Sequence, residues 1–237
     1  MKISRRQVIH TGTALTGLSL ALKPEQLLAQ AQAAAPTPAN LVDTPPRTLA
    51  DLPLAADGSA PEHAPGEAGG ISEPTLWRYT KGQPPPDLEV DYRTLKVKIT
   101  GGGVVKRSGT MTFADLEPLP RISHVFLLQC GAANPRGIVK WTGVRFADVA
   151  NMLGVLPSAA YCRFVAVDRY WSDEEVKTVM HPQVMLAWML NDAPIPPKHG
   201  APLRLVIPFR YGARSLKAIS EIQFTATSFA GPALPSV

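Results

Sequence analysis

The sequence predicts an α+β fold in a single domain, and three observations lead to this class. The chain has 237 residues, 45% of them hydrophobic and 18% charged, which is enough material for a real core. Short segments with the pattern of strands outnumber those with the pattern of helices, and their connections vary in length. No internal repeat or long heptad pattern is present. A mixed, sheet-rich structure with few helices follows from these observations.

Five segments are predicted as strands. Residues 93–100 alternate apolar and polar side chains, as in a half-buried strand, whereas residues 122–129 are more continuously apolar and read as a buried strand. The other three segments with strand character are residues 161–168, 202–208 and 219–226.

Helices are predicted at three places. Thr112 can cap a single helical turn. Residues 145–153 place Phe146, Val149, Ala150 and Leu153 on one face, with Gly154 as the stop. The apolar run of residues 183–190 is predicted as a further helix, and the charged residues between 168 and 174 are predicted as a solvated loop.

The chain divides into four parts by composition. Residues 1–31 have a basic start, a short apolar stretch and paired Arg5-Arg6 after Ser4, which is typical of a twin-arginine export signal and predicts a periplasmic protein. An ordinary secretory signal is the alternative. Residues 32–86 are rich in Pro, Ala and Gly and form a linker or arm. Residues 87–228 form the folded domain, and residues 229–237 a tail. No membrane span is expected in the mature chain.

Charge and motifs exclude several classes of function. The net charge is +5, but residues 1–31 contribute three of these charges, and no basic stripe interleaved with aromatic residues is present. Nucleic acid is therefore not an expected partner. The chain has no Gly-x-Ser-x-Gly elbow, no His-Glu-x-x-His, no paired Cys-x-x-Cys and no complete glycine-rich nucleotide motif.

Two segments need a functional explanation. The first, residues 199–222, carries four cations beside apolar strands: Arg204, Arg210, Arg214 and Lys217. Cations and small residues around a tight turn are suited to a buried phosphate, although a solvated hairpin with surface cations is the alternative. In the second, residues 124–137, Cys130 follows a buried run and opens a loop. This cysteine can be a ligand, core filler, or one half of a disulfide with Cys162.

The same segments carry a family resemblance. Cys130 is followed by Trp141-Thr142-Gly143-Val144 and an apolar helix, and residues 180–222 contain "HPQVMLAWMLNDAPIPPKHGAPLRLVIPFRYGARSLKAISEI". These blocks resemble the sulfite-oxidase-like molybdopterin oxidoreductases, which include sulfite dehydrogenases and the periplasmic methionine-sulfoxide reductase. The resemblance covers roughly residues 95–222. It implies a molybdopterin-binding catalytic domain of the sulfite-oxidase type, here without the immunoglobulin-like dimer domain that many members carry after it.

The resemblance also implies a cofactor and its site. The cofactor would be molybdenum-molybdopterin, without a nucleotide, and Cys130 would be the single protein thiolate on the metal. By position, His199 and Arg204 resemble pterin or phosphate contacts, and Arg214, Ser215 and Lys217 the cradle of the terminal phosphate. Asn134 and Arg136 would lie at the substrate mouth, although their spacing from the cysteine departs from the family form. The remaining candidates are Arg78, for the cofactor, and Tyr79, Tyr170 and Tyr211, for an active-site tyrosine.

The implied activity is oxygen-atom transfer to a small sulfur-containing oxyanion such as sulfite. Electrons would pass singly to a separate cytochrome or membrane haem protein, because the chain has no haem motif. Two alternatives stay open: a methionine-sulfoxide reductase of the same fold, and a non-catalytic periplasmic binding module that has lost the metal.

Overall fold

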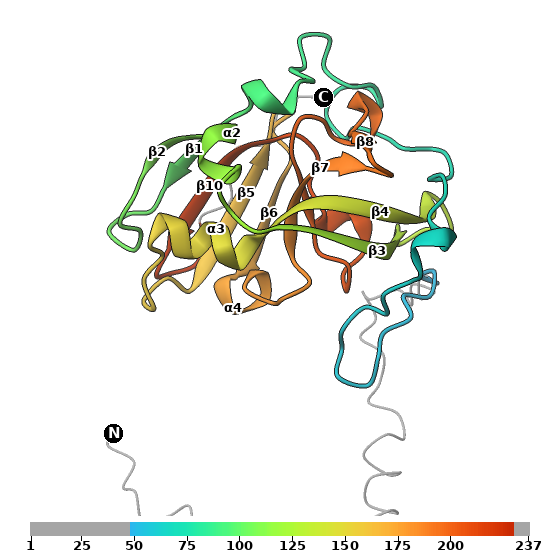
Figure 1. Ribbon diagram of the computed structural model, residues 1–237, viewed down its shortest axis with the longest axis horizontal. Helices are drawn as coiled ribbons and strands as arrows, with labels where there is room; N and C mark the ends of the chain where they lie inside the picture. Colours follow the sequence, from blue (N-terminus) through green and yellow to red (C-terminus); the bar gives the residue numbers. More distant parts are fainter. Residues whose placement is uncertain (1–47, 230–237) are drawn as a thin grey trace, which may run out of the picture. The chain divides into compact units, whose positions relative to one another are not determined.

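Two β-sheets organise residues 48–229, which are the residues described by the computed structural model (Figure 1). The first sheet has the order β2-β1-β10-β5-β6, with β1 and β10 parallel and the other pairs antiparallel. Its strands are β1 (Lys96–Thr100), β2 (Gly109–Thr112), β5 (Tyr161–Ala166), β6 (Trp171–Glu175) and β10 (Ile219–Thr225). The predicted export signal lies outside the described residues.

The second sheet has the order β3-β4-β7-β8, and β9 also pairs with β7. All of its pairs are antiparallel. Its strands are β3 (Arg121–Gln129), β4 (Arg136–Arg145), β7 (Met185–Leu190), β8 (Ala193–Pro194) and β9 (Arg204–Val206). The predicted α+β class with a β-rich architecture is confirmed.

Three short α-helices lie among the strands of the described chain: α2 (Phe113–Leu116), α3 (Phe146–Leu153) and α4 (Val176–Val179). The predicted start at Thr112 is confirmed, since the Asp115 carboxylate accepts hydrogen bonds from its backbone N–H and its hydroxyl, at 2.7 and 2.9 Å. The prediction for α3 is also confirmed: the apolar face is buried and the helix ends at Gly154. None of the helices in residues 48–229 is long and apolar enough to span a membrane.

The helix predicted for residues 183–190 is wrong, because this segment contains strand β7. Strand β7 lies between β4 and the β8 and β9 strands, and five of its six residues are buried. A strand buried on both faces lacks the alternation of a half-exposed strand and reads as a continuous apolar run. Such a run cannot be distinguished from a buried helix by periodicity alone.

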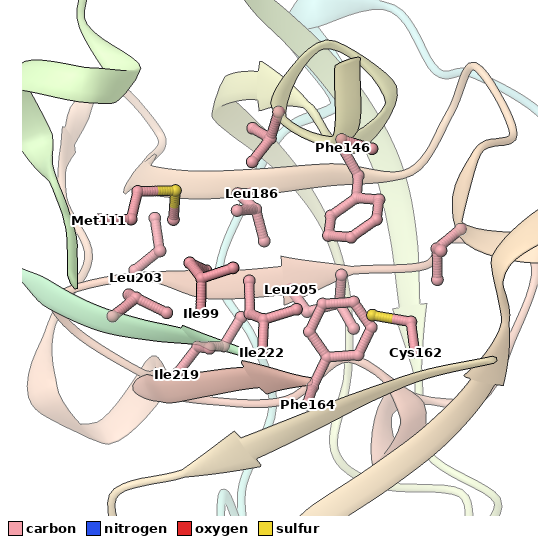
Figure 2. Packing of buried hydrophobic residues seen from close by; sticks show 14 of the residues in the cluster. Ile99, Met111, Phe146, Cys162, Phe164, Leu186, Leu203, Leu205, Ile219 and Ile222 are labelled. Carbon is pink, nitrogen blue, oxygen red and sulfur yellow. The ribbon is translucent and has the colours of Figure 1, made fainter. Parts of the chain in front are cut away.

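The two faces of the second sheet bury different clusters. Its inner face packs against the first sheet and α3 in the main core, where Leu186 and Leu205 lie opposite Phe164 and Ile222 (Figure 2). Its outer face carries a smaller cluster that includes Leu128, Val139, Trp141, Met185, Ala187 and Val206. We call this side of the second sheet the outer face.

The N-terminal segment of the described chain, residues 48–91, is attached to the second sheet, and we call it the arm. Backbone N–H groups of Gly69 and Ser72 donate to Ile138 and Arg136 of β4, both at 2.8 Å, where β4 extends beyond its pairing with β7. The arm crosses β4 so closely that a Cβ at Gly137 would lie 2.4 Å from the carbonyl oxygen of residue 70. Glycine is therefore required at this position of the strand.

Candidate functional site

Cys130 is the first residue after β3, in the six-residue loop that leads to β4. Its side chain is partly exposed, and its backbone N–H donates to the Pro135 carbonyl at 3.0 Å across the loop. Cys162 lies in the first sheet, fully buried, and both cysteines are free thiols in the structure. The disulfide alternative is therefore wrong for this structure, and burial raises the pKa of Cys162 well above its ordinary value.

Gln129 and the arm hold the loop in place. The Gln129 side chain is 1% exposed, and its Nε2 donates to the carbonyls of Cys130 and Ala132 at 2.8 and 2.9 Å. From the arm, the Ser72 hydroxyl donates to Asn134 Oδ1 at 2.7 Å and accepts the backbone N–H of Arg136 at 2.8 Å. The Gly131 carbonyl also accepts the backbone N–H of Ala50 at 3.0 Å, so five of the six loop residues are held through backbone or side-chain hydrogen bonds.

Of the two residues predicted for the substrate mouth, Asn134 and Arg136, only one has a side chain held by a neighbour. The Asn134 side chain accepts the bond from Ser72. The Arg136 side chain is exposed and forms no ion pair with any residue that the structure describes, although its backbone is fixed in β4. A cation beside the cysteine loop is therefore available to an anion from solvent.

A cluster of basic side chains lies at the outer face, with Arg204 buried and two partly buried neighbours, His199 and Lys217. Arg204 in β9 is 3% exposed, its guanidinium lies 5.1 Å from the centroid of the Trp141 ring, and it donates to the His199 carbonyl at 2.6 Å. Its Nε is buried without a hydrogen-bond partner in the described chain. Lys217 donates to the carbonyls of Lys198 and Leu76 at 2.8 and 3.3 Å. We call His199, Arg204 and Lys217 the cation cluster.

The electrostatics of the cation cluster are unfavourable as they stand. Burial, together with the charges of Arg204, Lys217 and Lys198, lowers the pKa of His199 to about 4. Burial and Arg204 lower the pKa of Lys217 to about 7, with Asp168 opposing the shift, and burial lowers the pKa of Arg204 to about 10. Within residues 48–229, no carboxylate forms an ion pair with any of the three. The buried Arg204 cation has no counter-charge in the described chain, and with the partly buried Lys217 it is suited to binding an anion, to which a neutral His199 can add a hydrogen bond.

The backbone brings the members of the cation cluster together. His199 ends a short 3-10 turn (Pro197–His199), and Gly200 follows it with φ 106°. A Cβ at Gly200 would lie 2.8 Å from the Cα of Lys217, so only glycine lets these two segments approach. The Ala218 N–H donates to the Gly200 carbonyl at 3.1 Å, which fixes Lys217 beside the turn.

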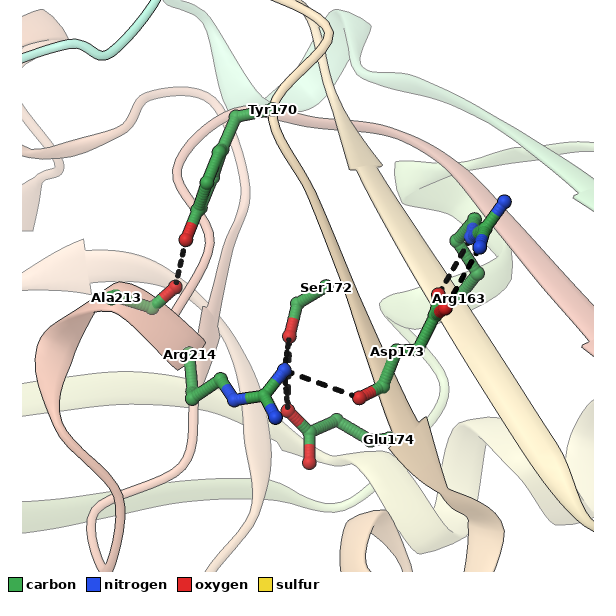
Figure 3. A network of polar contacts seen from close by, with 7 residues as sticks. All are labelled: Arg163, Tyr170, Ser172, Asp173, Glu174, Ala213 and Arg214. Atoms are coloured by element: carbon green, nitrogen blue, oxygen red, sulfur yellow. Dashed lines mark hydrogen bonds and ion pairs between the residues drawn. The ribbon is translucent and has the colours of Figure 1, made fainter. Parts of the chain in front are cut away.

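The predicted phosphate residues Arg214 and Ser215 have other partners. Arg214 Nη1 donates to the Ser172 hydroxyl at 2.8 Å and pairs with Glu174 at 3.3 Å (Figure 3). Ser215 is buried, and its hydroxyl oxygen accepts the Ile207 N–H at 3.0 Å. The Arg214 side chain is therefore directed at strand β6 and that of Ser215 at the residue after β9, while Lys217 is the member of this segment that joins the cluster.

The partners of Arg214 correct one prediction. The charged residues between 168 and 174 are not all in a solvated loop, because Ser172 and Glu174 are buried in strand β6 and Asp173 pairs with Arg163 at 2.6 Å. The polar side chains of Ser172 and Glu174 can be buried because Arg214, 40 residues after Glu174, donates a hydrogen bond to Ser172 and forms an ion pair with Glu174.

Arg78 and the candidate tyrosines lie around the turn of residues 211–214. The Arg78 guanidinium is 5.5 Å from the ring of Tyr170, whose hydroxyl donates to the Ala213 carbonyl at 3.1 Å. Tyr79 lies 6.2 Å from Tyr170, ring to ring. Tyr211 donates to the Ala50 carbonyl at 2.9 Å, and Ala50 in turn donates to Gly131 in the cysteine loop at 3.0 Å.

The arm links the cysteine loop to the cation cluster. Ser72 bonds to the loop and Leu76 to Lys217, and four residues span at most about 14 Å of extended backbone. A cavity of about 510 Å³ lies beside the cluster, lined by arm residues 73–76 and 82–84 and by residues 196–198. A larger cavity, of about 630 Å³, is lined by α3, α4 and β5 and includes no predicted site residue.

Three residues at this site escaped the sequence analysis. Trp77 is 3% exposed and lies under Lys217, 5.4 Å from the ring to Nζ, with its indole N–H buried and unpartnered in the described chain. Lys198 is next to His199 in the sequence, and this adjacency could have predicted that Lys198 also lies at the site. Gln129 precedes the cysteine, but nothing in the sequence marks it as buried.

The residues fit the implied cofactor. The described chain contains no group of three His, Cys, Asp or Glu residues that could hold a metal by itself. Cys130 offers one thiolate, so the other ligands would have to come from a cofactor such as a dithiolene. The cation cluster, with its orphaned Arg204 Nε, offers buried donors to an anionic group such as the pterin phosphate.

Comparisons with known proteins identify the family of this chain. The profile of a family described as "Oxidoreductase molybdopterin binding domain" matches residues 82–233. The protein-methionine-sulfoxide reductase catalytic subunit MsrP of Xanthomonas axonopodis pv. citri is 29% identical over 165 residues, 62% of this chain and 51% of that protein. The uncharacterized oxidoreductase YuiH of Bacillus subtilis is 30% identical over 129 residues, 54% of this chain and 65% of that protein.

A solved structure shares the fold. The sulfane dehydrogenase SoxCD from Paracoccus pantotrophus superposes with a TM-score of 0.56 at 17% identity, covering 93% of this chain and 57% of that chain. This likeness concerns the fold alone. The chain spans about half the length of the MsrP relative that it matches.

Proposed function

Because this chain belongs to the family of oxidoreductases with a molybdopterin-binding domain, we propose that it is a molybdenum enzyme that transfers an oxygen atom to or from sulfur. When bound, the cofactor supplies the two-electron redox chemistry and the oxygen exchange. Cys130 provides its protein thiolate, and His199, Arg204 and Lys217 bind its anionic end. The domain limits predicted from composition are retained in this proposal, with residues 87–228 as the catalytic domain.

The cation cluster is the observation that carries this proposal. Arg204 is buried, Lys217 and His199 are partly buried beside it, and no described carboxylate forms an ion pair with them. Burying such charges is unfavourable unless a counter-charge is present in the working protein. A phosphate at this position would supply that counter-charge, and the arm connects the position to the Cys130 loop.

Arg136 favours an anionic substrate such as sulfite. Its guanidinium is exposed beside the Cys130 loop and has no ion pair in the described chain, so it can attract an oxyanion and offset its charge. Sulfite would leave as sulfate, with an oxygen that derives from water, releasing two electrons and two protons. A separate cytochrome or membrane haem protein would take up the electrons one at a time.

The second candidate is sulfoxide reduction, which the name of the MsrP relative favours. In that direction a sulfoxide takes up two electrons and two protons and gives a sulfide and water. A sulfoxide carries no net charge, so this candidate gives Arg136 no role in attraction. For either direction, the basic leader of residues 1–31 supports export to the periplasm by the twin-arginine route.

The proposal is tested first by the metal content of the full chain, exported with its own leader. We expect one molybdenum per chain, lost in Cys130→Ser and retained in the matched control Cys162→Ala, whose thiol is fully buried elsewhere. Absence of molybdenum from the wild type rejects the enzyme in favour of a non-catalytic module, whereas its retention in Cys130→Ser rejects Cys130 as the required protein ligand.

Whether the enzyme adds oxygen to its substrate or removes it is tested with two assays on the same protein. Sulfite oxidation is followed with ferricyanide as acceptor, and methionine-sulfoxide reduction with reduced benzyl viologen as donor. If sulfite is the substrate, Arg136→Ala raises its KM by about tenfold, because a charge-assisted contact is lost. Reduction of the sulfoxide with no effect of Arg136→Ala establishes the second candidate instead.

A further inference from the structure

We propose that Gln129 is a positioning residue for the Cys130 thiolate, acting through its side-chain amide on the cysteine loop. This inference rests on the proposed function in one respect, namely that Cys130 is the protein ligand of the metal. Gln129 touches neither the metal nor the substrate in this assignment. Its role is to fix the direction in which the sulfur leaves the backbone.

The geometry of Gln129 is unusual for a core residue. Its side chain is 1% exposed at the end of β3, where the neighbouring buried positions are apolar. A primary amide has two N–H donors, and both are used on carbonyls of the loop, those of Cys130 and Ala132. Its Oε1 is buried with no hydrogen-bond partner among the described residues. The two bonds to the loop offset the cost of burying the amide donors, whereas the unpartnered Oε1 leaves part of the burial cost uncompensated.

These bonds fix both sides of the cysteine. The Cys130 N–H donates across the loop to Pro135, and the Cys130 carbonyl accepts from Gln129. With the peptide groups before and after it held, the side chain of Cys130 retains rotation about its own Cα–Cβ bond as its main freedom. Metal ligands need to be held within about 0.5 Å and 10–20° of their working geometry, and residues behind the ligand usually provide this.

The packing around Gln129 supports a fixed position. A Cβ added at Gly212 would lie 3.5 Å from the Gln129 carbonyl oxygen, so the turn that precedes Lys217 rests on the end of β3. The position of the cysteine loop is thereby linked to the segment that carries part of the cation cluster. A displaced Gln129 would move the thiolate relative to that cluster.

The sharpest variant is Gln129→Glu, which keeps the shape and replaces both donors by an acceptor facing two carbonyls. Gln129→Met removes the donors without adding charge. The matched control is Ser123→Ala, which deletes a 2.7 Å hydrogen bond to Thr142 between the same two strands, away from the loop. Each is made in the full chain and compared with the wild type by thermal unfolding.

The first readout is the electron paramagnetic resonance spectrum of the half-reduced metal in the loaded enzyme, which depends on the metal–sulfur geometry. We expect shifted g-values in both Gln129 variants and an unchanged spectrum in Ser123→Ala. The second readout is alkylation of Cys130 in cofactor-free chain, with buried Cys162 as internal reference. Loss of two hydrogen bonds from the loop is expected to change this rate on the order of tenfold.

The outcomes separate this inference from the proposed function. Folded Gln129→Glu and Gln129→Met with wild-type spectra and alkylation rates overturn the positioning role, and so does a shift confined to Gln129→Glu, which would be an effect of charge. If neither variant folds while Ser123→Ala does, Gln129 is a folding residue and the inference fails. A wild type without molybdenum rejects the proposed function, and molybdenum retained in Cys130→Ser rejects the ligand role on which this inference rests, whereas the alkylation result is independent of the metal.

Discussion

The two faces of the second sheet are both buried, but they are buried in different ways. On the inner face, Leu186 and Leu205 pack against the first sheet in a core of apolar side chains (Figure 2). On the outer face, Arg204 lies beside Trp141 under the arm, with a buried nitrogen that has no partner in the described chain. Strand β9 shows the contrast within two residues, since Arg204 faces outward and Leu205 inward.

This difference separates stability from function. Apolar burial on the inner face lowers the free energy of the fold in proportion to the area removed from water. The buried Arg204 cation on the outer face, which has no ion pair in the described chain, raises it, as is expected where a protein binds a counter-charge. The proposed site lies where a charged side chain is buried without an ion pair, and substitutions on the two faces should have opposite consequences.

The largest loss of stability is expected from Phe164→Ala in the inner core. Phe164 is fully buried and contacts Phe146 edge to face at 5.2 Å between ring centroids. Removing a buried phenyl ring costs about 3–5 kcal/mol of unfolding free energy, measured by urea unfolding. The matched control is Val167→Ala, just after the same strand and 42% exposed, which should change stability by less than about 0.5 kcal/mol. A loss below 1 kcal/mol in Phe164→Ala contradicts the inner core described here.

Arg204→Met is expected to act in the opposite way. Arg204 is as buried as the core residues, yet Met removes an unpaired charge and keeps most of the volume, so cofactor-free protein should stay within about 1 kcal/mol of wild type. Molybdenum content should fall sharply, because the anionic end of the cofactor loses a donor. Urea unfolding and elemental analysis measure the two effects. A loss above 3 kcal/mol with normal metal content shows instead that Arg204 serves the fold.

The sequence analysis succeeded where the pattern is local. Strand β3 and helix α3 are each determined by their own apolar spacing, and both were predicted near their observed limits. The prediction for β7 failed because the burial of both its faces depends on segments that are distant in the sequence, namely other strands and the arm. The prediction of a loop in place of the polar strand β6 failed for the same reason, because its buried Glu174 forms an ion pair with the distant Arg214.

The candidate site was predicted in the same uneven way. The structure brings Lys217 together with His199 and Arg204, whereas the family resemblance placed Lys217 with Arg214 and Ser215; the roles of all five residues stay predictions. The Arg214 side chain lies with β6 instead of the cluster. Gln129 and Trp77 were missed because their burial comes from tertiary contacts that leave no trace in spacing.

A smaller effect on the unfolding free energy of cofactor-free protein is expected from a change of pH. Lys217 has a pKa of about 7 in the fold and 10.5 ordinarily, so between these values the unfolded chain binds more protons and unfolding free energy rises with pH. His199, with about 4 against 6.5, gives the same sign at lower pH. Urea unfolding from pH 6 to 9 should show the upper rise, and Lys217→Met should flatten it. An unchanged slope in Lys217→Met means that this lysine is not the titrating group.

The smallest effect is expected from the exposed ion pair between Glu73 of the arm and Lys198, beside the cation cluster. Both side chains are about half exposed, so Glu73→Gln should change the unfolding free energy by less than about 1 kcal/mol and not at all in 1 M salt. The pair thus tests whether charged side chains on the outer face affect the unfolding free energy only when they are buried. Urea unfolding at low and high salt measures it, with Lys98, which pairs with Glu221 on the first sheet, changed to Gln as the matched control. A larger, salt-resistant loss in Glu73→Gln alone means that this contact is what holds the arm over the cluster, and that the outer face depends on an ion pair for its burial.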